Sequence, residues 1–200
     1  MHYKIQMTLA LLGSLAAAHA QTLSGPALVQ ALRHGGYVIV MRHASSPQKP
    51  PAKPDADPDN VNVERQLDEV GRATAAAMGA ALRDLKIPIG EVLSSPTYRA
   101  LETVRLAQFG KPETFAELGD GGQSMRGATD AQSAWLQKKV TEFHTGSNTL
   151  IVTHFPNIMR AFPQWSAGLA DGEALVLGPD RNGGAALVAR VKIEDWPAMH

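Results

Sequence analysis

Two apolar runs, each followed closely by a histidine, constrain the fold of this chain more than any other feature of its sequence. The runs cover residues 37–41 (YVIVM) and 149–152 (TLIV). Both are rich in β-branched residues and lack a polar alternation, which is typical of strands buried on both faces of a parallel sheet. Ligands of open α/β sheets bind at the carboxyl ends of such strands. His43 and His154 therefore fall where a site is expected.

The segments around these runs alternate between helical and strand-like patterns. Helices are expected from Ser24 to the Gly-Gly pair at 35–36, and over 68–86, 96–109 and 130–143. Pro96 is expected in the first turn of its helix, and Asp130 is expected to cap another. A strand is expected at 91–94, and two more within 174–193 around a turn at 180–184. This order predicts one three-layer α/β domain, with a mostly parallel central sheet flanked by helices on both faces.

The first twenty residues have the pattern of an export signal. Lys4 gives a positive start, residues 7–18 are mostly apolar, and an Ala-His-Ala tripeptide at 18–20 suits signal peptidase. The apolar run is shorter than the roughly 20 residues of a membrane-spanning helix; a buried N-terminal helix is the alternative. We expect residues 1–20 to be removed, leaving 21–200 as one domain in the periplasm or outside the cell, with no stable membrane insertion.

Charge and cysteine content exclude several classes of function. The chain has 19 basic and 19 acidic side chains and no block rich in Lys or Arg, so nucleic acid is not an expected partner. It contains no cysteine, which excludes cysteine nucleophiles, thiolate metal sites and disulfides. A P-loop and an HExxH zinc motif are also absent from the sequence. We expect neither a metal nor another cofactor.

An arginine precedes the first of the two strand-end histidines. Arg42 and His43 directly follow the run at 37–41. Arg33 and His34 form a second Arg-His pair, but this pair follows a helical segment and precedes the strand, which places it at the opposite end of the sheet. Capping and the helix dipole explain a histidine at a helix C-terminus. We therefore assign the chemistry to Arg42 and His43.

A third segment, 94–103 (SSPTYRALET), opens a helix after the strand at 91–94. The start of a helix presents N–H groups to an anion, and Arg99 adds a planar, permanently charged guanidinium. Taken alone, the segment is typical of an ordinary capped helix with a solvated arginine. Together with Arg42 and the two histidines, it predicts a compact cationic pocket suited to a phosphoryl group.

These motifs, in this order, resemble the histidine phosphatase superfamily, whose members include phosphoglycerate mutases, acid phosphatases and phosphohistidine phosphatases. The matching pieces are Arg-His-Ala at 42–44, a helix entry at 67–71, Ser-Pro-x-x-Arg-Ala-x-x-Thr at 95–103, and Thr-His at 153–154. The family usually has glycine after the Arg-His pair, where this chain has Ala44. The resemblance implies a histidine phosphatase domain over 21–200, of the phosphoglycerate mutase-like and phosphohistidine phosphatase-like branch.

The resemblance implies that His43 attacks phosphorus and forms a phosphohistidine intermediate, while Arg42, Arg99 and His154 hold the phosphoryl oxygens. The residue chemistry agrees, because a neutral imidazole is nucleophilic and the cations around it stabilise the transferring charge. The same cations should favour the neutral form of His43. Arg65 stands where some small members have an arginine that reaches the phosphate. A solvated loop arginine is the alternative there.

The proton donor for an alkoxide leaving group is a separate question. The family places this acid after the arginine-bearing helix, where the chain reads FAELGDGG at 115–122. Glu117 is the preferred candidate because it follows a short apolar strand, and Asp120 is the second, since a glycine-flanked Asp could be only a turn former. Phosphohistidine phosphatases can manage without this acid, because imidazole leaves easily. Asn157 could contact substrate or help start the next helix.

Together, the sequence predicts an exported, metal-independent phosphatase that hydrolyses a small-molecule phosphomonoester. Two alternatives remain open at this point: a mutase that returns the phosphoryl group from His43 to its substrate, and a non-catalytic phospholigand-binding protein. The residues do not name the substrate. Specificity is expected in a proline-rich loop or lid at 45–62 and in the segment 119–130.

Overall fold

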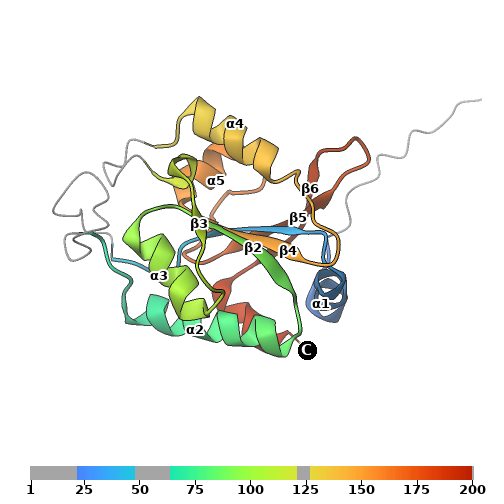
Figure 1. Ribbon diagram of the computed structural model, residues 1–200, viewed down its shortest axis with the longest axis horizontal. Helices are drawn as coiled ribbons and strands as arrows, with labels where there is room; N and C mark the ends of the chain where they lie inside the picture. Colours follow the sequence, from blue (N-terminus) through green and yellow to red (C-terminus); the bar gives the residue numbers. More distant parts are fainter. Residues whose placement is uncertain (1–21, 48–63, 121–126, 200) are drawn as a thin grey trace, which may run out of the picture.

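The computed structural model describes residues 22–47, 64–120 and 127–199. The described residues form a six-stranded sheet with the strand order β3-β2-β4-β1-β5-β6, which runs through the centre of the molecule (Figure 1). The expected signal peptide at 1–20 and most of the proline-rich segment at 45–62 lie outside the described residues. In the described ranges, no helix has the length and apolar character needed to cross a membrane.

Strands and helices alternate along the chain as the sequence predicts. The strands are β1 (Val38–Arg42), β2 (Ile89–Ser94), β3 (Glu113–Thr114), β4 (Asn148–Thr153), β5 (Ala174–Pro179) and β6 (Ala185–Val191). The α-helices are α1 (Gly25–His34), α2 (Glu69–Asp84), α3 (Tyr98–Ala107), α4 (Asp130–Lys139) and α5 (Phe155–Ala161). The described ranges also contain two 3₁₀ segments, η2 (Ala116–Leu118) and η3 (Ile193–Ala198).

The central strands of the sheet are parallel, which confirms the predicted fold class. β3, β2, β4 and β1 run in one direction, and β5 and β6 extend the sheet in antiparallel fashion. Arg42, the last residue of β1, pairs with Thr153, the last residue of β4. His43 and His154 therefore leave the sheet side by side, at its carboxyl edge.

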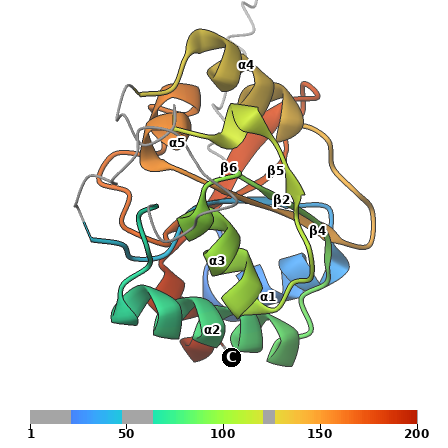
Figure 2. The same ribbon diagram turned by 60° about the vertical axis from the view of Figure 1, so that its left-hand side comes forward.

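Each face of the sheet is covered by its own hydrophobic core. Successive strand residues point to opposite faces, and β1 shows this directly. Ile39 and Met41 pack in the core that includes α1, α2, α3 and η3, while Val38 and Val40 pack in the core beneath α4 and α5. Both views show α4 and α5 on one side of the sheet and α2 on the other (Figures 1 and 2). Burial on both sides explains why the run at 37–41 has no polar alternation.

Small residues bring α2 very close to its neighbours, as the composition of 68–86 indicates. A Cβ atom on Gly79 would lie 2.0 Å from the carbonyl oxygen of Ala107 at the end of α3. A Cβ atom on Gly71 would lie 2.1 Å from the carbonyl oxygen of Ser45. Only glycine fits at these two contacts, so α2 supports both α3 and the segment that follows His43.

The start of α3 differs from the prediction. Pro96 does not lie in the first turn; the helix begins at Tyr98, and Thr97 is an extended N-cap with ψ 144°. The cause is local, because the peptide N–H of Thr97 donates to Ser95 Oγ over 3.2 Å and holds the backbone out of the helix. The helix ends at Ala107, ahead of residue 109, where Gln108 adopts a left-handed conformation with φ 58°.

Two further expectations are wrong in detail. α4 is capped by Thr129 and not by Asp130, because Thr129 and Gln132 form a reciprocal capping box, and the helix ends at Lys139 instead of 143. The strand before Glu117 is not apolar. β3 consists of two exposed residues at the edge of the sheet, and Glu117 lies in η2.

Candidate active site

The loops that follow β1, β2 and β4 converge on one cavity of about 160 Å³. Its lining combines three arginines, two histidines, one aspartate and an apolar pair: Arg42, Arg65, Arg99, His43, His154, Asp120, Phe155 and Pro156. The structure thus brings together every residue predicted to bind phosphate, and Glu117 is the one predicted catalytic residue outside this lining.

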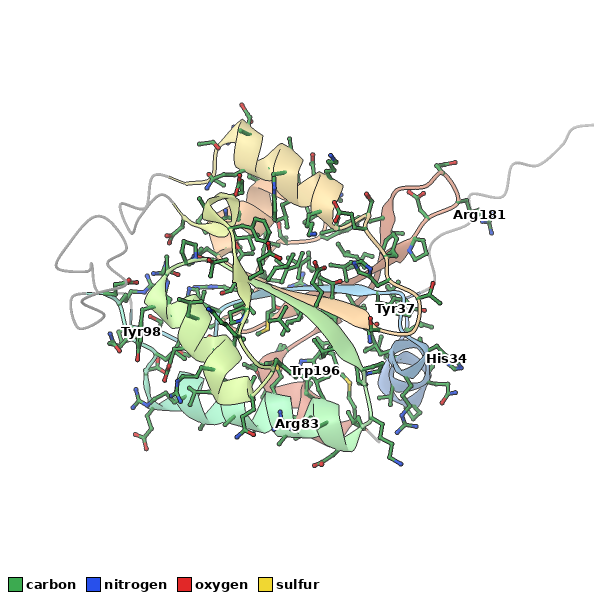
Figure 3. The ribbon with its side chains drawn as sticks, in the orientation of Figure 1. His34, Tyr37, Arg83, Tyr98, Arg181 and Trp196 are labelled. Atoms are coloured by element: carbon green, nitrogen blue, oxygen red, sulfur yellow. The ribbon has the colours of Figure 1, made fainter. Side chains whose placement is uncertain are left out.

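His34, in the second Arg-His pair, lies far from this cavity. Figure 3 shows His34 beside α1 at one end of the sheet and Tyr98, the neighbour of Arg99, at the other end. The Nδ1–H group of His34 donates to the carbonyl oxygen of Gln30 over 2.7 Å. The exposed His34 ring therefore serves the end of its own helix.

His43 is held as a neutral ring with one defined tautomer. Its Nδ1 atom lies 2.8 Å from the carbonyl oxygen of Ala44, and because a carbonyl can only accept, Nδ1 carries the hydrogen. The unprotonated Nε2 atom accepts from Arg99 Nε over 3.1 Å and from Arg65 Nη2 over 3.4 Å. Burial, together with the nearby His154, Arg99 and Arg65, holds the pKa of His43 well below its usual 6.5.

His154 is equally buried, but both of its ring nitrogens are engaged. Nδ1 accepts from Arg99 Nη2 over 2.9 Å, so Nε2 carries the hydrogen and donates to Ser95 Oγ over 2.8 Å. Burial first, and then the positive charges of the surrounding arginines, keep the pKa of this ring well below 6.5. The rings of His43 and His154 meet edge to face, with centroids 5.3 Å apart.

Arg99 is the centre of the cluster, with only 1% of its surface exposed. Besides its contacts with the two histidines, its Nη2 atom forms a buried ion pair with Asp120. Its Nη1 atom is buried without a hydrogen-bond partner in the described part of the chain. A buried guanidinium with an unused N–H group can donate it to an anionic oxygen.

Arg42 and Arg65 flank the cavity in different ways. Arg42 Nη2 forms an ion pair with Asp171 over 2.5 Å, and its guanidinium lies 5.7 Å from the centre of the Phe155 ring. Arg65 Nε donates to Ser46 Oγ over 2.8 Å. Burial and the charge of Arg99 lower the pKa of Arg65 to about 10, so it stays a cation near neutral pH. Sequence reasoning missed Asp171, because it lies in a loop before β5 with no local motif.

The N-terminus of α3 is occupied, contrary to the expectation that it would be offered to an anion. The peptide N–H of Tyr98 donates to Oε2 of Glu64 over 2.6 Å, and Glu64 is only 5% exposed. The Glu64 carboxylate also acts on Arg99 through its charge. The Glu64 carboxylate occupies the position at the N-terminus of α3 that was predicted for phosphate. In the sequence, only the position of Glu64 next to Arg65 pointed to a place near the site.

The two candidates for the proton donor are placed differently. Asp120 lines the cavity, is 8% exposed, and lies 3.5 Å from His154 Nδ1 as well as against Arg99. Glu117 lies in η2, half-buried and outside the cavity lining, and its carbonyl oxygen accepts from the Asn157 side chain. The geometry favours Asp120 over Glu117, since only Asp120 lines the cavity.

The described residues contain no cluster of three His, Asp or Glu side chains arranged to hold a metal ion. A larger hollow of about 380 Å³ lies between α2 and η3, but its lining is mainly alanine and other apolar side chains, with Asp84 as its one charged residue. The cavity of about 160 Å³ is the candidate active site, because it combines buried cations with two neutral imidazoles.

The fold and this cavity define an α/β domain with a buried cationic pocket, which is suited to a phosphoryl group. The sequence model of the histidine phosphatase superfamily, branch 1, matches residues 38–118, which include His43, Arg65 and Arg99. No curated protein matches the chain in sequence.

Solved structures of similar fold carry related names. The protein histidine phosphatase SixA complexed with tungstate has a TM-score of 0.57 and 20% identity, covering 80% of this chain and 98% of its own. A phosphoserine phosphatase mutant from Entamoeba histolytica in complex with phosphoserine has a TM-score of 0.53 and 12% identity, covering 79% and 98%. YhfR of Bacillus stearothermophilus has a TM-score of 0.52 and 18% identity, covering 76% and 94%.

This match over residues 38–118 supports the resemblance to the histidine phosphatase superfamily. The family match and the cavity together support a phosphatase or a phosphoryl-transferring mutase.

Proposed function

We propose that this protein is an exported phosphatase that hydrolyses a small-molecule phosphomonoester without a metal ion, through a phosphohistidine on His43. The observation that carries the proposal is the state of His43 Nε2. This atom is unprotonated, borders the cavity, and is surrounded by N–H groups of Arg99 and Arg65. A nucleophile with cationic donors around it suits attack on an electron-rich phosphoryl group.

In the first step, the lone pair of His43 Nε2 attacks phosphorus, and the bond from phosphorus to the leaving oxygen breaks. Arg42, Arg65 and Arg99 bind the non-bridging oxygens and stabilise their negative charge. The Nδ1–H bond to the Ala44 carbonyl keeps the ring oriented and stabilises the positive charge that develops on it. The leaving oxygen takes a proton from Asp120, which lies in the same cavity.

In the second step, water attacks the phosphohistidine and gives a proton to Asp120, the P–N bond breaks, and inorganic phosphate leaves. Asp120 thus acts as acid first and base second, and no net proton is gained or lost by the enzyme. With no substrate bound, Asp120 is the ionised partner of Arg99 in the buried site. Asp120 takes up one proton when the phosphoryl group of the substrate replaces it at Arg99, and releases this proton when inorganic phosphate leaves.

One similar structure suits this substrate class. It is titled a phosphoserine phosphatase complexed with phosphoserine, so small phosphorylated side chains are reasonable first probes. A cavity of about 160 Å³ favours a substrate whose phosphoryl group enters alone, with the leaving group at the mouth beside Phe155 and Pro156.

The test is phosphate release from p-nitrophenyl phosphate by purified protein in the presence of EDTA. We expect turnover that EDTA does not change, together with an acid-labile, base-stable phosphoprotein when the reaction is quenched at early times. His43→Asn should abolish both signals. Metal-dependent turnover, or a phosphoprotein that survives in His43→Asn, would overturn the proposal.

The same assay separates the phosphatase from a mutase. Labelled phosphate should appear in inorganic phosphate faster than it appears on a second hydroxyl of a sugar or glycerate substrate. The export proposal is tested by expressing the full chain and sequencing the N-terminus of the extracytoplasmic product, which should begin at Gln21. Retention of residues 1–20 would overturn that part alone.

A further inference from the structure

The three carbonyl groups directly before Asp120 are all held by side chains. Oγ1 of Thr153 donates to the carbonyl oxygen of Leu118 over 2.6 Å. The Nδ2 amide of Asn157 donates to the carbonyl oxygens of Gly119 over 2.8 Å and of Glu117 over 3.2 Å. The backbone that leads to the aspartate is therefore fixed by specific polar contacts, although it lies beyond the end of the exposed edge strand β3.

The donors of these bonds lie on both sides of His154 in the chain. Thr153 ends β4 and is fully buried, and Asn157 lies in the first turn of α5 with 2% exposure. The peptide N–H of Asn157 also donates to the carbonyl oxygen of His154 over 3.1 Å. One short stretch of chain thus supports His154 and, through its side chains, the backbone that carries Asp120.

The sequence left open whether Asn157 contacts substrate or helps start the next helix, and the side-chain contacts of Asn157 bear on this question. The two hydrogens of its amide point at carbonyls 117 and 119, so this group holds the backbone and is not used as a donor to substrate. A second amide, Gln132 Nε2 at the start of α4, also donates to the Gly119 carbonyl over 2.8 Å. A carbonyl that accepts two side-chain bonds is strongly fixed in direction.

We propose that Asn157 and Thr153 are positioning residues for Asp120, a role that rests on the proposed function of Asp120 as proton donor. A general acid works only within hydrogen-bonding distance of the leaving oxygen. A misplacement of about 1 Å can cost about 100-fold in rate. Buried donors on consecutive carbonyls limit such movement, because each broken bond would leave a buried polar group without its partner. The segment is thereby kept in register with His154 and Arg99.

The test compares two leaving groups. Thr153→Val keeps the shape of the side chain and removes its donor, and Asn157→Ala removes both amide hydrogens. Each variant should lower kcat for an alkyl substrate, glycerol phosphate, about tenfold more than kcat for p-nitrophenyl phosphate, whose leaving group needs little protonation. The pH dependence of kcat for glycerol phosphate should flatten as well, because a misplaced Asp120 contributes less to protonation of the leaving oxygen.

Gln137→Glu is the matched control. Gln137 Nε2, in α4, makes the same kind of bond to the carbonyl oxygen of Ala161 in α5 over 2.8 Å, and Gln137 lies outside the cavity lining. This variant should leave the ratio of alkyl to aryl turnover unchanged. If it shifts the ratio as Thr153→Val does, the effect comes from general loosening and the positioning role is wrong.

A double variant isolates the route of action. In an Asp120→Asn background, adding Thr153→Val should bring no further loss with glycerol phosphate, because the residue acts through Asp120. Additive losses would overturn the positioning role. If Asp120→Asn is itself selective for alkyl substrates while Thr153→Val and Asn157→Ala are not, only the positioning role fails. If Asp120→Asn slows both substrates equally, the assignment of the proton donor fails and the positioning role fails with it.

Discussion

A buried histidine follows each of the strands β1 and β4, yet the surroundings of the two rings give them different chemistry. His43 and His154 are both buried beside Arg99, and both have a pKa well below the usual value for histidine. The ring of His154 has a fixed protein partner at each nitrogen, through Arg99 and Ser95. The ring of His43 has a backbone partner only at Nδ1, and its Nε2 accepts from the side chains of Arg99 and Arg65, which border the cavity.

The comparison teaches which histidine can react. A phosphoryl group entering the cavity can take over the N–H groups of Arg99 and Arg65 and leave the His43 lone pair directed at phosphorus. The lone pair of His154 Nδ1 accepts from Arg99, which also forms an ion pair with Asp120. The N–H group of His154 donates to Ser95 Oγ. His43 is therefore the nucleophile in the proposed reaction, and His154 supports Arg99.

Exchanging each histidine for asparagine should give the largest difference between the two strand ends. His43→Asn should lower phosphate release by about 10⁴-fold or more, because no nucleophile remains. His154→Asn should cost about 10²- to 10³-fold, the range for loss of one stabilising group. Rapid-quench labelling checks the distinction: only His154→Asn should still form the acid-labile phosphoprotein. Label on a His43→Asn chain would reverse the assignment.

The two arginines that contact His43 should differ in a similar sense. Arg99→Lys should lower kcat/KM by about 100-fold or more, because one ammonium group cannot reproduce the contacts to both histidines and to Asp120. Arg65→Lys should cost only about tenfold, since Arg65 is half-buried and contacts His43 at 3.4 Å. Steady-state kinetics on both variants measure this, and equal losses would contradict the central place of Arg99.

The lowered pKa values predict how stability depends on pH. Below about pH 6.5 the unfolded chain protonates both histidines while the folded chain does not, so the free energy of unfolding falls as the pH falls. Each histidine should contribute a slope of up to about 1.4 kcal/mol per pH unit in this range. Urea denaturation of wild type and His43→Asn between pH 5 and 7 checks this, and the variant should show the shallower slope. Identical slopes would mean that His43 is protonated in the folded protein.

The smallest effect is expected from the other Arg-His pair. His34→Ala should leave kcat and KM within about twofold of wild type, because the ring lies at the opposite end of the sheet and bonds to Gln30 of its own helix. The free energy of unfolding should fall by about 0.3–1 kcal/mol, the range of a favourable group at a helix C-terminus. A large loss of activity would mean that the active site has been assigned to the wrong end of the sheet.

Much of this site could be predicted from the sequence, because the direction of each strand can be read locally and decides at which edge of the sheet its last residues lie. The runs at 37–41 and 149–152 showed two buried strands, and parallel strands bring their carboxyl ends to one edge. That reasoning separated His43 from His34 and brought Arg42, Arg99 and His154 together. The preference for Glu117 is not supported by its placement, because the expected apolar strand before it is an exposed two-residue edge strand followed by a 3₁₀ turn.

The sequence by itself determined the fold class, the end of the sheet at which the chemistry lies, and the identities of the histidines and arginines there. Hydrophobic periodicity and strand polarity carry the fold class and the end of the sheet, whereas Arg65 was identified only through the resemblance to the histidine phosphatase superfamily. The tertiary structure alone decided which acid enters the cavity, that Glu64 occupies the end of α3, and that Thr153 and Asn157 hold the backbone before Asp120. These contacts join residues far apart in the chain through single hydrogen bonds, which leave no periodic pattern in the sequence.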